Sequence, residues 1–332
     1  MNKIALAIHG GAGTILRSAM TPVLDLEYRG GLENALSGGW AILKKGGTAL
    51  DAVEATVAAL EDFPLFNAGR GSVFTHEGKN EMDAAIMDGK NLKAGAVAFV
   101  RNVKNPIKLA RLVMEKTEHV LLAGDGAIQF AEEMNVELAD DSYFYKEHRW
   151  KQLEEAIAAG RVQLDHSEIQ IPDSKFQIEN DAEIWNMESG ISNNPKPLGT
   201  VGAVACDANG NLAAATSTGG MTNKKFGRVG DTAIIGSGTY AENATCAVSC
   251  TGHGEFFQRG VTAYDVAARM KYKGIGLEDA ARETMEHLTK IGGEGGLIAV
   301  DAQGNVVLPF NSEGMYRGFT PNDGKMHVEI YR

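Results

Sequence analysis

Residues 199–218 read GTVGAVACDANGNLAAATST and contain two apolar runs separated by a turn signal. The runs span residues 200–205 and 212–216, and both are rich in alanine. Asn209-Gly210 lies between them, and Asn-Gly is a strong short-range signal for a β-hairpin. The stretch therefore predicts two buried antiparallel strands that begin abruptly at Gly199-Thr200.

Strand and helix patterns alternate along the chain before this hairpin. An apolar strand at residues 4–8 leads into a predicted tight turn, His9-Gly-Gly-Ala-Gly13, and helical spacing covers residues 27–45. Thr48 and Asp51 form a capping box that starts a second helix. The apolar stripe of this helix consists of Ala49, Val53, Val57 and Leu60. Further strands are expected at residues 72–75, 81–87, 94–100 and 120–123, and further helices from Pro106 onward, at about 126–136 and at about 146–159.

The pattern after the hairpin is similar. Strands are expected near residues 232–236 and 245–250, helices at about 253–271 and 277–290, and a second hairpin from residues 297–300 and 306–310. Two sheets with helices on their outer faces would bury every apolar stripe. A doubly wound sheet satisfies the same pattern, so the residues alone predict an α/β protein and leave both arrangements open.

Residues 161–197 differ from the rest of the chain because they are polar and acidic and keep no period. They end in Ser-Asn-Asn-Pro-Lys-Pro. Long segments of this kind in compact proteins are usually functional or act as linkers. We expect an exposed, mobile segment of more than 30 residues shortly before Thr200.

The composition of the 332 residues argues against several classes of protein. A net charge of −11, from 32 basic and 43 acidic residues, disfavours nucleic-acid binding, which needs a basic face. The N-terminal apolar stretch is too short for a signal peptide, and no run approaches the ~18 apolar residues of a membrane span. The three cysteines lack zinc-type spacing and predict reduced, buried thiols: Cys206, Cys246 and Cys250. We therefore expect a cytoplasmic protein without nucleic-acid or membrane partners.

Common catalytic motifs are absent from the sequence. The chain has no GxSxG elbow, no GxxxxGK[ST] loop, no complete GxGxxG fingerprint and no HExxH. These absences weigh against α/β-hydrolase, nucleotide-binding, dinucleotide-binding and zinc-protease functions.

Thr200 admits two interpretations. It is either an ordinary β-branched residue that opens a strand or, if the chain is cut after Gly199, the first residue of a new chain. In the second case its hydroxyl lies next to its own α-amine, whose unperturbed pKa of ~7.7–8.0 suits a general base near neutral pH. Gly199 favours such a cut, because a residue without Cβ allows a strained approach of its carbonyl to the Thr200 hydroxyl.

Two glycine-rich segments carry further candidate groups. Residues 249–255, SCTGHGE, turn from a strand into a helix, and a glycine-rich entry exposes unpaired helix amides to a developing oxyanion. The Thr251 hydroxyl adds one donor, and a simple capped helix start is the alternative. Arg228 and Asp231 lie in the loop GRVGD. They are either a solvated surface pair or a clamp for the carboxylate and ammonium groups of an α-amino acid.

Eight motifs occur over nearly the whole chain: His9-Gly-Gly-Ala-Gly13, Asn67-Ala-Gly-Arg-Gly71, Met82-Asp-Ala-Ala-Ile-Met-Asp-Gly89, Gly199-Thr-Val-Gly-Ala203, Thr216-Ser-Thr-Gly-Gly-Met-Thr-Asn223, Gly227-Arg-Val-Gly-Asp231, Ser249-Cys-Thr-Gly-His-Gly-Glu255 and Pro309-Phe-Asn-Ser-Glu-Gly-Met-Tyr316. In this order they resemble the type 2, or plant-type, asparaginase/isoaspartyl peptidase family of N-terminal nucleophile hydrolases. One such motif would be weak, whereas eight together are specific.

The resemblance implies a fold and a maturation step. The chain would cleave itself between Gly199 and Thr200 into an α-subunit, residues 1–199, and a β-subunit, residues 200–332. The α-subunit would end in a variable linker at about residues 161–199. Both subunits would fold into one four-layer αββα sandwich, an α/β (α+β) fold, and two such αβ heterodimers would associate.

The resemblance also implies the reaction and its groups. The enzyme would hydrolyse isoaspartyl (β-aspartyl) dipeptides and L-asparagine to L-aspartate through an acyl-enzyme on Thr200, without a prosthetic group. Thr218 would assist the nucleophile by hydrogen bonding, and Asn67 would orient the Thr200 end. Thr251 and the Gly252 amide would form the oxyanion hole.

The substrate and a structural ion would be held by further residues. Arg228 and Asp231 would bind the aspartyl α-carboxylate and α-amine, with backbone help from Gly252 and Gly254. The resemblance implies a structural sodium ion as well, held by backbone oxygens of Leu60, Glu61, Phe63, Phe66, Ala68 and Arg70.

Two other functions remain open from the sequence. A glycosylasparaginase shares the nucleophile chemistry, but it is normally lysosomal or secreted, and the chain shows neither a signal peptide nor a disulfide framework. A non-catalytic amino-acid-binding protein would keep the Arg228 and Asp231 clamp and never cut before Thr200.

Overall fold

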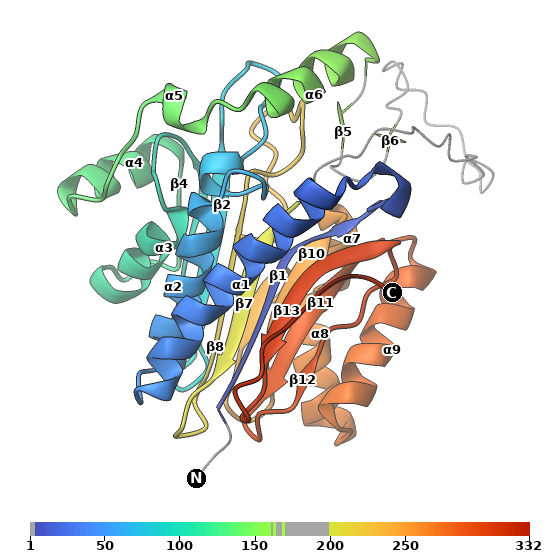
Figure 1. Cartoon of the computed structure of the whole chain (residues 1–332). Coiled ribbons are helices and arrows are strands. Elements are labelled where there is room, and N and C mark those ends of the chain that lie inside the picture. The colour runs from blue at the N-terminus through green and yellow to red at the C-terminus, as the bar shows by residue number, and fades with distance from the viewer. Residues whose placement is uncertain (1–3, 161, 164–167, 170–198) are drawn as a thin grey trace, which may run out of the picture.

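Two stacked β-sheets form the centre of the computed structural model, which describes residues 4–160, 162–163, 168–169 and 199–332. Helices cover the outer face of each sheet, so the layers follow in the order α, β, β, α (Figure 1). The predicted four-layer sandwich is confirmed. The doubly wound alternative is excluded, because a doubly wound fold has one sheet between two helical layers.

The larger sheet has the strand order β14-β13-β1-β7-β8-β2-β3-β4, and neighbours are antiparallel except for β3 and β4. Its strands are β1 (Ala5–Gly13), β2 (Met82–Asp88), β3 (Ala94–Val100), β4 (Leu121–Ala123), β7 (Val201–Cys206), β8 (Leu212–Thr218), β13 (Gly314–Thr320) and β14 (His327–Tyr331). The predicted hairpin is confirmed, since β7 and β8 pair from Val201 opposite Ser217 to Cys206 opposite Leu212.

The smaller sheet has the strand order β12-β11-β10-β9. Its strands are β9 (Thr239–Ala241), β10 (Cys246–Gly252), β11 (Gly295–Asp301) and β12 (Val306–Val307). A separate antiparallel pair consists of β5 (Val162–Gln163) and β6 (Glu168–Ile169). Apart from these two strands, the segment 161–197 that we expected to be exposed and mobile lies outside the described residues.

Amphipathic helices bury the outer faces of both sheets. The larger sheet is covered by α1 (Pro22–Lys44), α2 (Ala49–Asp62) and α3 (Pro106–Lys116). The smaller sheet is covered by α7 (Gly254–Gly260), α8 (Thr262–Ala268), the π-helix η3 (Arg269–Lys273) and α9 (Leu277–Lys290). The remaining helices are η1 (Arg17–Ala19), η2 (Gly69–Gly71), α4 (Gly124–Glu133), α5 (Asp141–Phe144) and α6 (Glu147–Ala158). Within the described ranges, no helix is long and apolar enough to cross a membrane.

Local signals explain several of these elements. Thr48 caps α2 as predicted, and its hydroxyl accepts a hydrogen bond from the Asp51 N–H at 3.0 Å. Pro106 occupies the first position of α3, where its missing N–H costs nothing. The predicted cysteine state is also confirmed, because the three thiols are buried and free.

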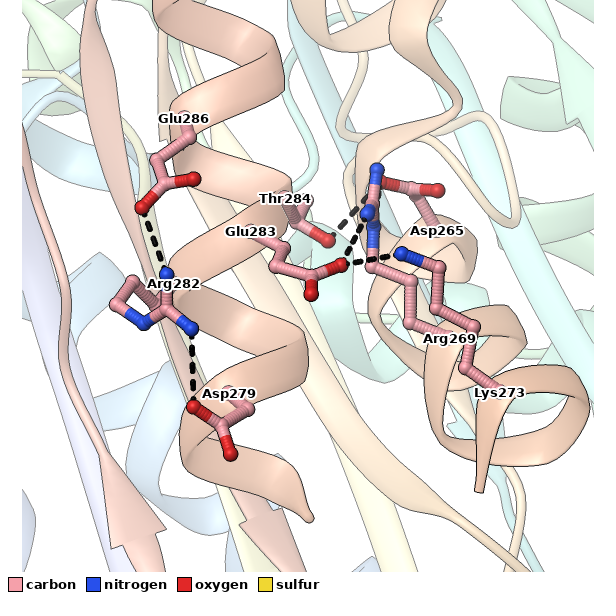
Figure 2. Close-up of polar contacts among 8 residues, drawn as sticks. All are labelled: Asp265, Arg269, Lys273, Asp279, Arg282, Glu283, Thr284 and Glu286. Carbon is pink, nitrogen blue, oxygen red and sulfur yellow. Dashed lines mark hydrogen bonds and ion pairs between the residues drawn. The ribbon is translucent and has the colours of Figure 1, made fainter. Parts of the chain in front are cut away.

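Polar contacts hold the helices over the smaller sheet together (Figure 2). Arg269 in η3 pairs with Glu283 of α9 at 2.7 Å, and Lys273 reaches the same carboxylate at 2.6 Å. The Thr284 hydroxyl of α9 donates to Asp265 of α8 at 2.9 Å. Because the charged side chains of these pairs are partly exposed, the ion pairs orient the helices more than they stabilise the fold.

Side-chain alternation along the strands places polar residues between the two sheets. In β1, Leu6 and Ile8 face the helices, whereas Ala5 and Ala7 face the smaller sheet. Because side chains alternate between the two faces of a strand, His9 also faces the smaller sheet. The same period applies to the strands β7, β8 and β10. At one end of the sandwich the space between the sheets therefore contains hydroxyl and imidazole groups instead of apolar side chains: His9, Thr200, Thr216, Thr218, Ser249 and Thr251.

Several predicted elements are wrong. Residues 72–75 contain one isolated bridge instead of a strand, and residues 232–236 form turns, while the nearby strand is β9. The glycines at 9–13 do not form a tight turn, because β1 continues through them with a bulge between His9 and Gly11. Pairing of residues 11–13 with β13 overrides the turn preference of these glycines.

The C-terminal part contains two further differences. The helix expected at about 253–271 is broken at Val261, whose φ of +47° separates α7 from α8. Strands β13 and β14 were not predicted, because β13 begins with glycine and contains a second glycine at Gly318. Both strands are stabilised by pairing along the edge of the larger sheet and not by local preference.

Candidate active site

Thr200 lies directly before β7 and is buried, with 8% of its surface exposed. Its hydroxyl donates to the Thr218 hydroxyl at 3.1 Å across the β7–β8 hairpin. The Thr218 oxygen also accepts the Gly220 N–H at 3.0 Å, which fixes its orientation. The two threonines of the predicted nucleophile pair are therefore in direct contact.

Thr251 approaches this pair from the smaller sheet. It is fully buried near the end of β10, and its oxygen accepts the Ala12 N–H at 3.3 Å. Because this bond uses a lone pair of the oxygen, the hydroxyl hydrogen is still available to donate. The neighbouring Gly252 has φ +144°, and a Cβ there would lie 2.3 Å from the Glu294 carbonyl oxygen. Only glycine fits this turn from β10 into α7.

Arg228 is held in a fixed orientation by Glu255, a residue to which the sequence assigned no role. The guanidinium donates two hydrogen bonds to the Glu255 carboxylate, at 2.8 and 2.9 Å. Burial alone would lower the pKa of Arg228, but the Glu255 hydrogen bonds raise it above its usual value. Such a two-point pair places a permanent positive charge with little freedom to move.

Asp231 lies close to this cation and is almost fully buried. Burial raises its pKa to about 7, against the opposing effect of Arg228. Its Oδ2 atom has no hydrogen-bond partner within the described part of the chain. Gly254 separates the two charged groups, since a Cβ there would lie 2.8 Å from Arg228 Nη2 and 2.8 Å from Asp231 Oδ1. The surface-pair alternative is therefore wrong, because Asp231 is 4% exposed and the Arg228 side chain is 19% exposed.

Asn67 is linked to Thr200 through Gly220 and Thr218. Its side chain donates to the Gly220 carbonyl at 2.7 Å and accepts the Val73 N–H at 3.0 Å. It therefore connects the loop after α2 to the turn that follows Thr218. Its contacts place it behind Thr218 rather than beside the Thr200 hydroxyl.

The loop after α2 contains oxygen atoms of the type that a hard cation prefers. The carbonyls of Leu60, Phe66 and Ala68 each accept one backbone hydrogen bond and keep a second lone pair. The Glu61 side chain is buried, and burial raises its pKa to about 8. Its Oε2 atom has no hydrogen-bond partner among the described residues. The donor types in this loop fit a monovalent cation.

His9, Thr216, Ser249 and Glu255 are site residues that the sequence reasoning did not single out. His9 and Ser249 are fully buried and contact each other at 2.8 Å, although they come from different sheets. The sequence contained a signal for two of these residues. Ser249 precedes Thr251 by two positions and Thr216 precedes Thr218 by two, so each pair faces the same side of its strand.

Comparison with known proteins gives consistent matches over the whole chain. A family model described as asparaginase matches residues 2–330. The chain is 50% identical to an isoaspartyl peptidase of Salmonella typhimurium, over 100% of both chains. It is 48% identical to an isoaspartyl peptidase of Escherichia coli, over 100% of this chain and 97% of the relative. It is 44% identical to a plant-type L-asparaginase of Pyrococcus abyssi, over 95% of this chain and 96% of the relative.

Proposed function

The chain belongs to the asparaginase family and is a hydrolase, and on this premise we propose that it releases L-aspartate from isoaspartyl (β-aspartyl) dipeptides and from L-asparagine. The observation that carries the substrate class is the buried Asp231 Oδ2, which has no hydrogen-bond partner among the described residues and lies beside the clamped Arg228 guanidinium. An α-ammonium group would satisfy Asp231, and an α-carboxylate would bind Arg228. The free aspartyl end of both substrates carries these two groups.

Maturation would create the nucleophile. The Thr200 hydroxyl attacks the Gly199 carbonyl, the acyl group moves from nitrogen to oxygen, and water hydrolyses the resulting ester. The products are the chains 1–199 and 200–332, which stay folded together as one sandwich. The direct contact between Thr200 and Thr218 supports this step, because it holds the attacking hydroxyl in place.

Turnover would use the same hydroxyl with the newly freed amine. The amine accepts the hydroxyl proton, and Thr200 attacks the side-chain carbonyl of the aspartyl group. Thr251 and the Gly252 amide stabilise the oxyanion, while Thr218 orients the nucleophile and Asn67 supports the turn behind Thr218. Ammonia or an amino acid leaves, and water then releases aspartate from the acyl-enzyme.

The intact mass of the purified protein and a substrate panel test this proposal together. We expect two chains that end and begin at Gly199 and Thr200, a native mass of two αβ pairs, and aspartate release from β-aspartyl dipeptides and L-asparagine. A single chain that binds aspartate without releasing it from any substrate would indicate a binding protein. Preferential cleavage of a glycosylated asparagine would indicate a glycosylasparaginase instead.

Replacing Thr251 by alanine should slow turnover without unfolding the protein. Loss of one oxyanion donor typically lowers kcat by ~10²–10³-fold. The measurement is kcat for a β-aspartyl dipeptide, with the melting temperature as a check of folding. Thr245→Ala is the matched control, because Thr245 is a buried threonine directly before the first residue of β10, at the other end of the strand from Thr251. Near-normal turnover by Thr251→Ala would remove Thr251 from the site.

Binding of L-aspartate should weaken as the pH falls below about 7. The ammonium of the ligand needs the Asp231 carboxylate in its ionised form, and burial raises the pKa of Asp231 to about 7 in the free enzyme. Below that pH a proton must leave Asp231 on binding, so the inhibition constant of aspartate should rise about tenfold per pH unit. Competitive inhibition measured between pH 5.5 and 8 checks this. Asp231→Asn should bind weakly at every pH, and a constant affinity in the wild type would contradict the assignment.

The sodium site is part of the same proposal. Backbone oxygens of Leu60, Glu61, Phe63, Phe66, Ala68 and Arg70 would hold the ion and stiffen the loop that carries Asn67. An ion that binds only the folded protein stabilises it by ~2.7 kcal/mol at a hundred times its Kd. We therefore expect the melting temperature to rise with sodium chloride and not with choline chloride of equal ionic strength. Equal curves for the two salts would argue against the site.

A further inference from the structure

A chain of buried hydrogen bonds joins the predicted nucleophile to the smaller sheet. His9 Nδ1 lies 3.0 Å from the Thr200 carbonyl oxygen, and His9 Nε2 lies 2.8 Å from Ser249 Oγ. Ser249 Oγ lies 2.7 Å from Thr216 Oγ1, and the Thr239 hydroxyl donates to Thr216 at 2.7 Å. The side chains of His9, Ser249, Thr216 and Thr239 are fully buried.

The direction of each bond follows from the chemistry of its atoms. A carbonyl oxygen only accepts, so His9 Nδ1 carries the hydrogen and donates to Thr200. Burial lowers the pKa of His9 to about 3, so the ring is neutral and Nε2 accepts. Ser249 therefore donates to His9, and Thr216 in turn donates to Ser249. Thr216 and Thr239 also lie 3.3 and 3.2 Å from the carbonyl oxygens of Gly238 and Thr232, but their hydroxyl contacts at 2.7 Å are shorter, so the main bonds run from Thr239 to the Thr200 carbonyl.

The backbone at Gly202 leaves space for this chain of hydrogen bonds where it crosses from the larger sheet to the smaller one. Gly202 faces it from β7, and a Cβ there would lie 2.0 Å from Ser249 Oγ and 2.4 Å from His9 Nε2. No L-residue with a side chain fits at this position unless the contact between the imidazole and the hydroxyl is broken.

The chain of bonds also links the two halves of the reaction site. Ser249 lies two residues before Thr251 on β10, so both side chains point to the same face. His9 lies on β1, and the same strand supplies the Ala12 N–H that binds the Thr251 oxygen. Strand β1 therefore contacts both the nucleophile and the residue expected to stabilise the oxyanion.

We propose that neutral His9 is a positioning residue, which holds the Thr200 carbonyl and, through Ser249, sets the distance between the nucleophile and the Thr251 strand. This inference rests on the proposed function. His9 takes up no proton during turnover; it restricts the backbone of Thr200, on which both the amine and the hydroxyl depend. A displacement of about 1 Å in such a geometry lowers rates by ~10²-fold.

The test compares His9→Leu with His9→Asn. Leucine removes both hydrogen bonds, whereas the asparagine amide can place an N–H near the Nδ1 position and keep the bond to Thr200. We expect His9→Leu to lower kcat by ~10²-fold while KM stays within about twofold of the wild-type value. The kcat of His9→Asn should be at least about tenfold higher than that of His9→Leu. Each kcat is divided by the fraction of chain cut before Thr200, measured by intact mass.

Two controls separate positioning from a general loss of stability. Leu36→Ala opens a cavity in the core on α1, on the helix side of the larger sheet, and should lower the melting temperature while kcat stays unchanged. The acid limb of the kcat–pH profile should keep its position in His9→Asn, because His9 is neutral throughout. Loss of this limb would identify His9 as a titrating base and overturn the proposal.

Other outcomes also decide the question. An unchanged kcat in His9→Leu, in an enzyme that releases aspartate and depends on Thr200, would overturn the role of His9 and leave the proposed function standing. A wild-type protein that neither cuts itself nor releases aspartate would overturn both. If His9→Leu does not fold, Ser249→Ala removes the bonds from Ser249 to His9 Nε2 and to Thr216, and leaves the bond from His9 Nδ1 to the Thr200 carbonyl. It should lower kcat by about threefold to tenfold, and an unchanged kcat there would contradict the proposal.

Discussion

Replacing Thr200 by alanine should give a single uncut chain of 332 residues with no measurable turnover. The substitution removes the hydroxyl that would attack the Gly199 carbonyl, so neither the nucleophile nor its free α-amine can form. Loss of the nucleophile in a comparable hydrolase lowers kcat by about 10⁶-fold. The measurements are intact mass after prolonged incubation and aspartate release from a β-aspartyl dipeptide.

Two variants control for this result. Thr200→Ser keeps a hydroxyl and, after cleavage, an α-amine, so it should still cut itself and turn over. Thr284→Ala removes another buried threonine, on α9 in the outer helical layer (Figure 2), and should behave as the wild type. A chain that is still cut between Gly199 and Ala in the Thr200→Ala variant would disprove self-cleavage by this hydroxyl.

Replacing Arg228 by alanine should lower kcat/KM for β-aspartyl dipeptides on the order of 10²–10³-fold, mostly through KM. The guanidinium is mostly buried and makes two hydrogen bonds to Glu255. Removing one partner of a buried charged pair typically costs 2–5 kcal/mol, because the remaining charge loses its partner. Here the substrate α-carboxylate would lose the cation that the proposal pairs with it.

The choice of substrate tests whether Arg228 binds the α-carboxylate. A dipeptide whose aspartyl α-carboxylate is converted to an amide should have a low kcat/KM with the wild type. Its kcat/KM with Arg228→Ala should be no lower, because both changes remove the same contact. Arg259→Ala is the matched control, since Arg259 lies exposed on α7, the helix that carries Glu255. An unchanged KM for the unmodified dipeptide in Arg228→Ala would show that the clamp is assigned wrongly.

Glu255 was recognised as part of a motif, but only the structure connects it to Arg228. The two residues lie 27 positions apart and meet because the turn at Gly252 directs α7 toward the loop that carries Arg228. The buried state of Asp231 depends on the same arrangement. In the sequence, Arg228 and Asp231 are indistinguishable from a solvated pair, because spacing carries no information on desolvation.

Local signals in the sequence determined the elements whose stability is local. Asn209-Gly210 sets the β7–β8 hairpin, Thr48 starts α2, and Pro106 starts α3, because turn geometry and helix caps involve residues only a few positions apart. The order of the motifs identified the family and, through it, the predicted roles of Thr200, Thr218 and Thr251.

The residue pattern left two sheet arrangements open and only the family resemblance indicated the sandwich, whereas the tertiary structure alone decided which polar groups meet. His9 and Ser249 are 240 positions apart, and their contact exists only because the two sheets stack with Gly202 between them. The glycine-rich course of β1 and the strand β13 likewise depend on pairing partners distant in the chain. Such contacts arise from packing the whole chain, and no short window of sequence contains both partners.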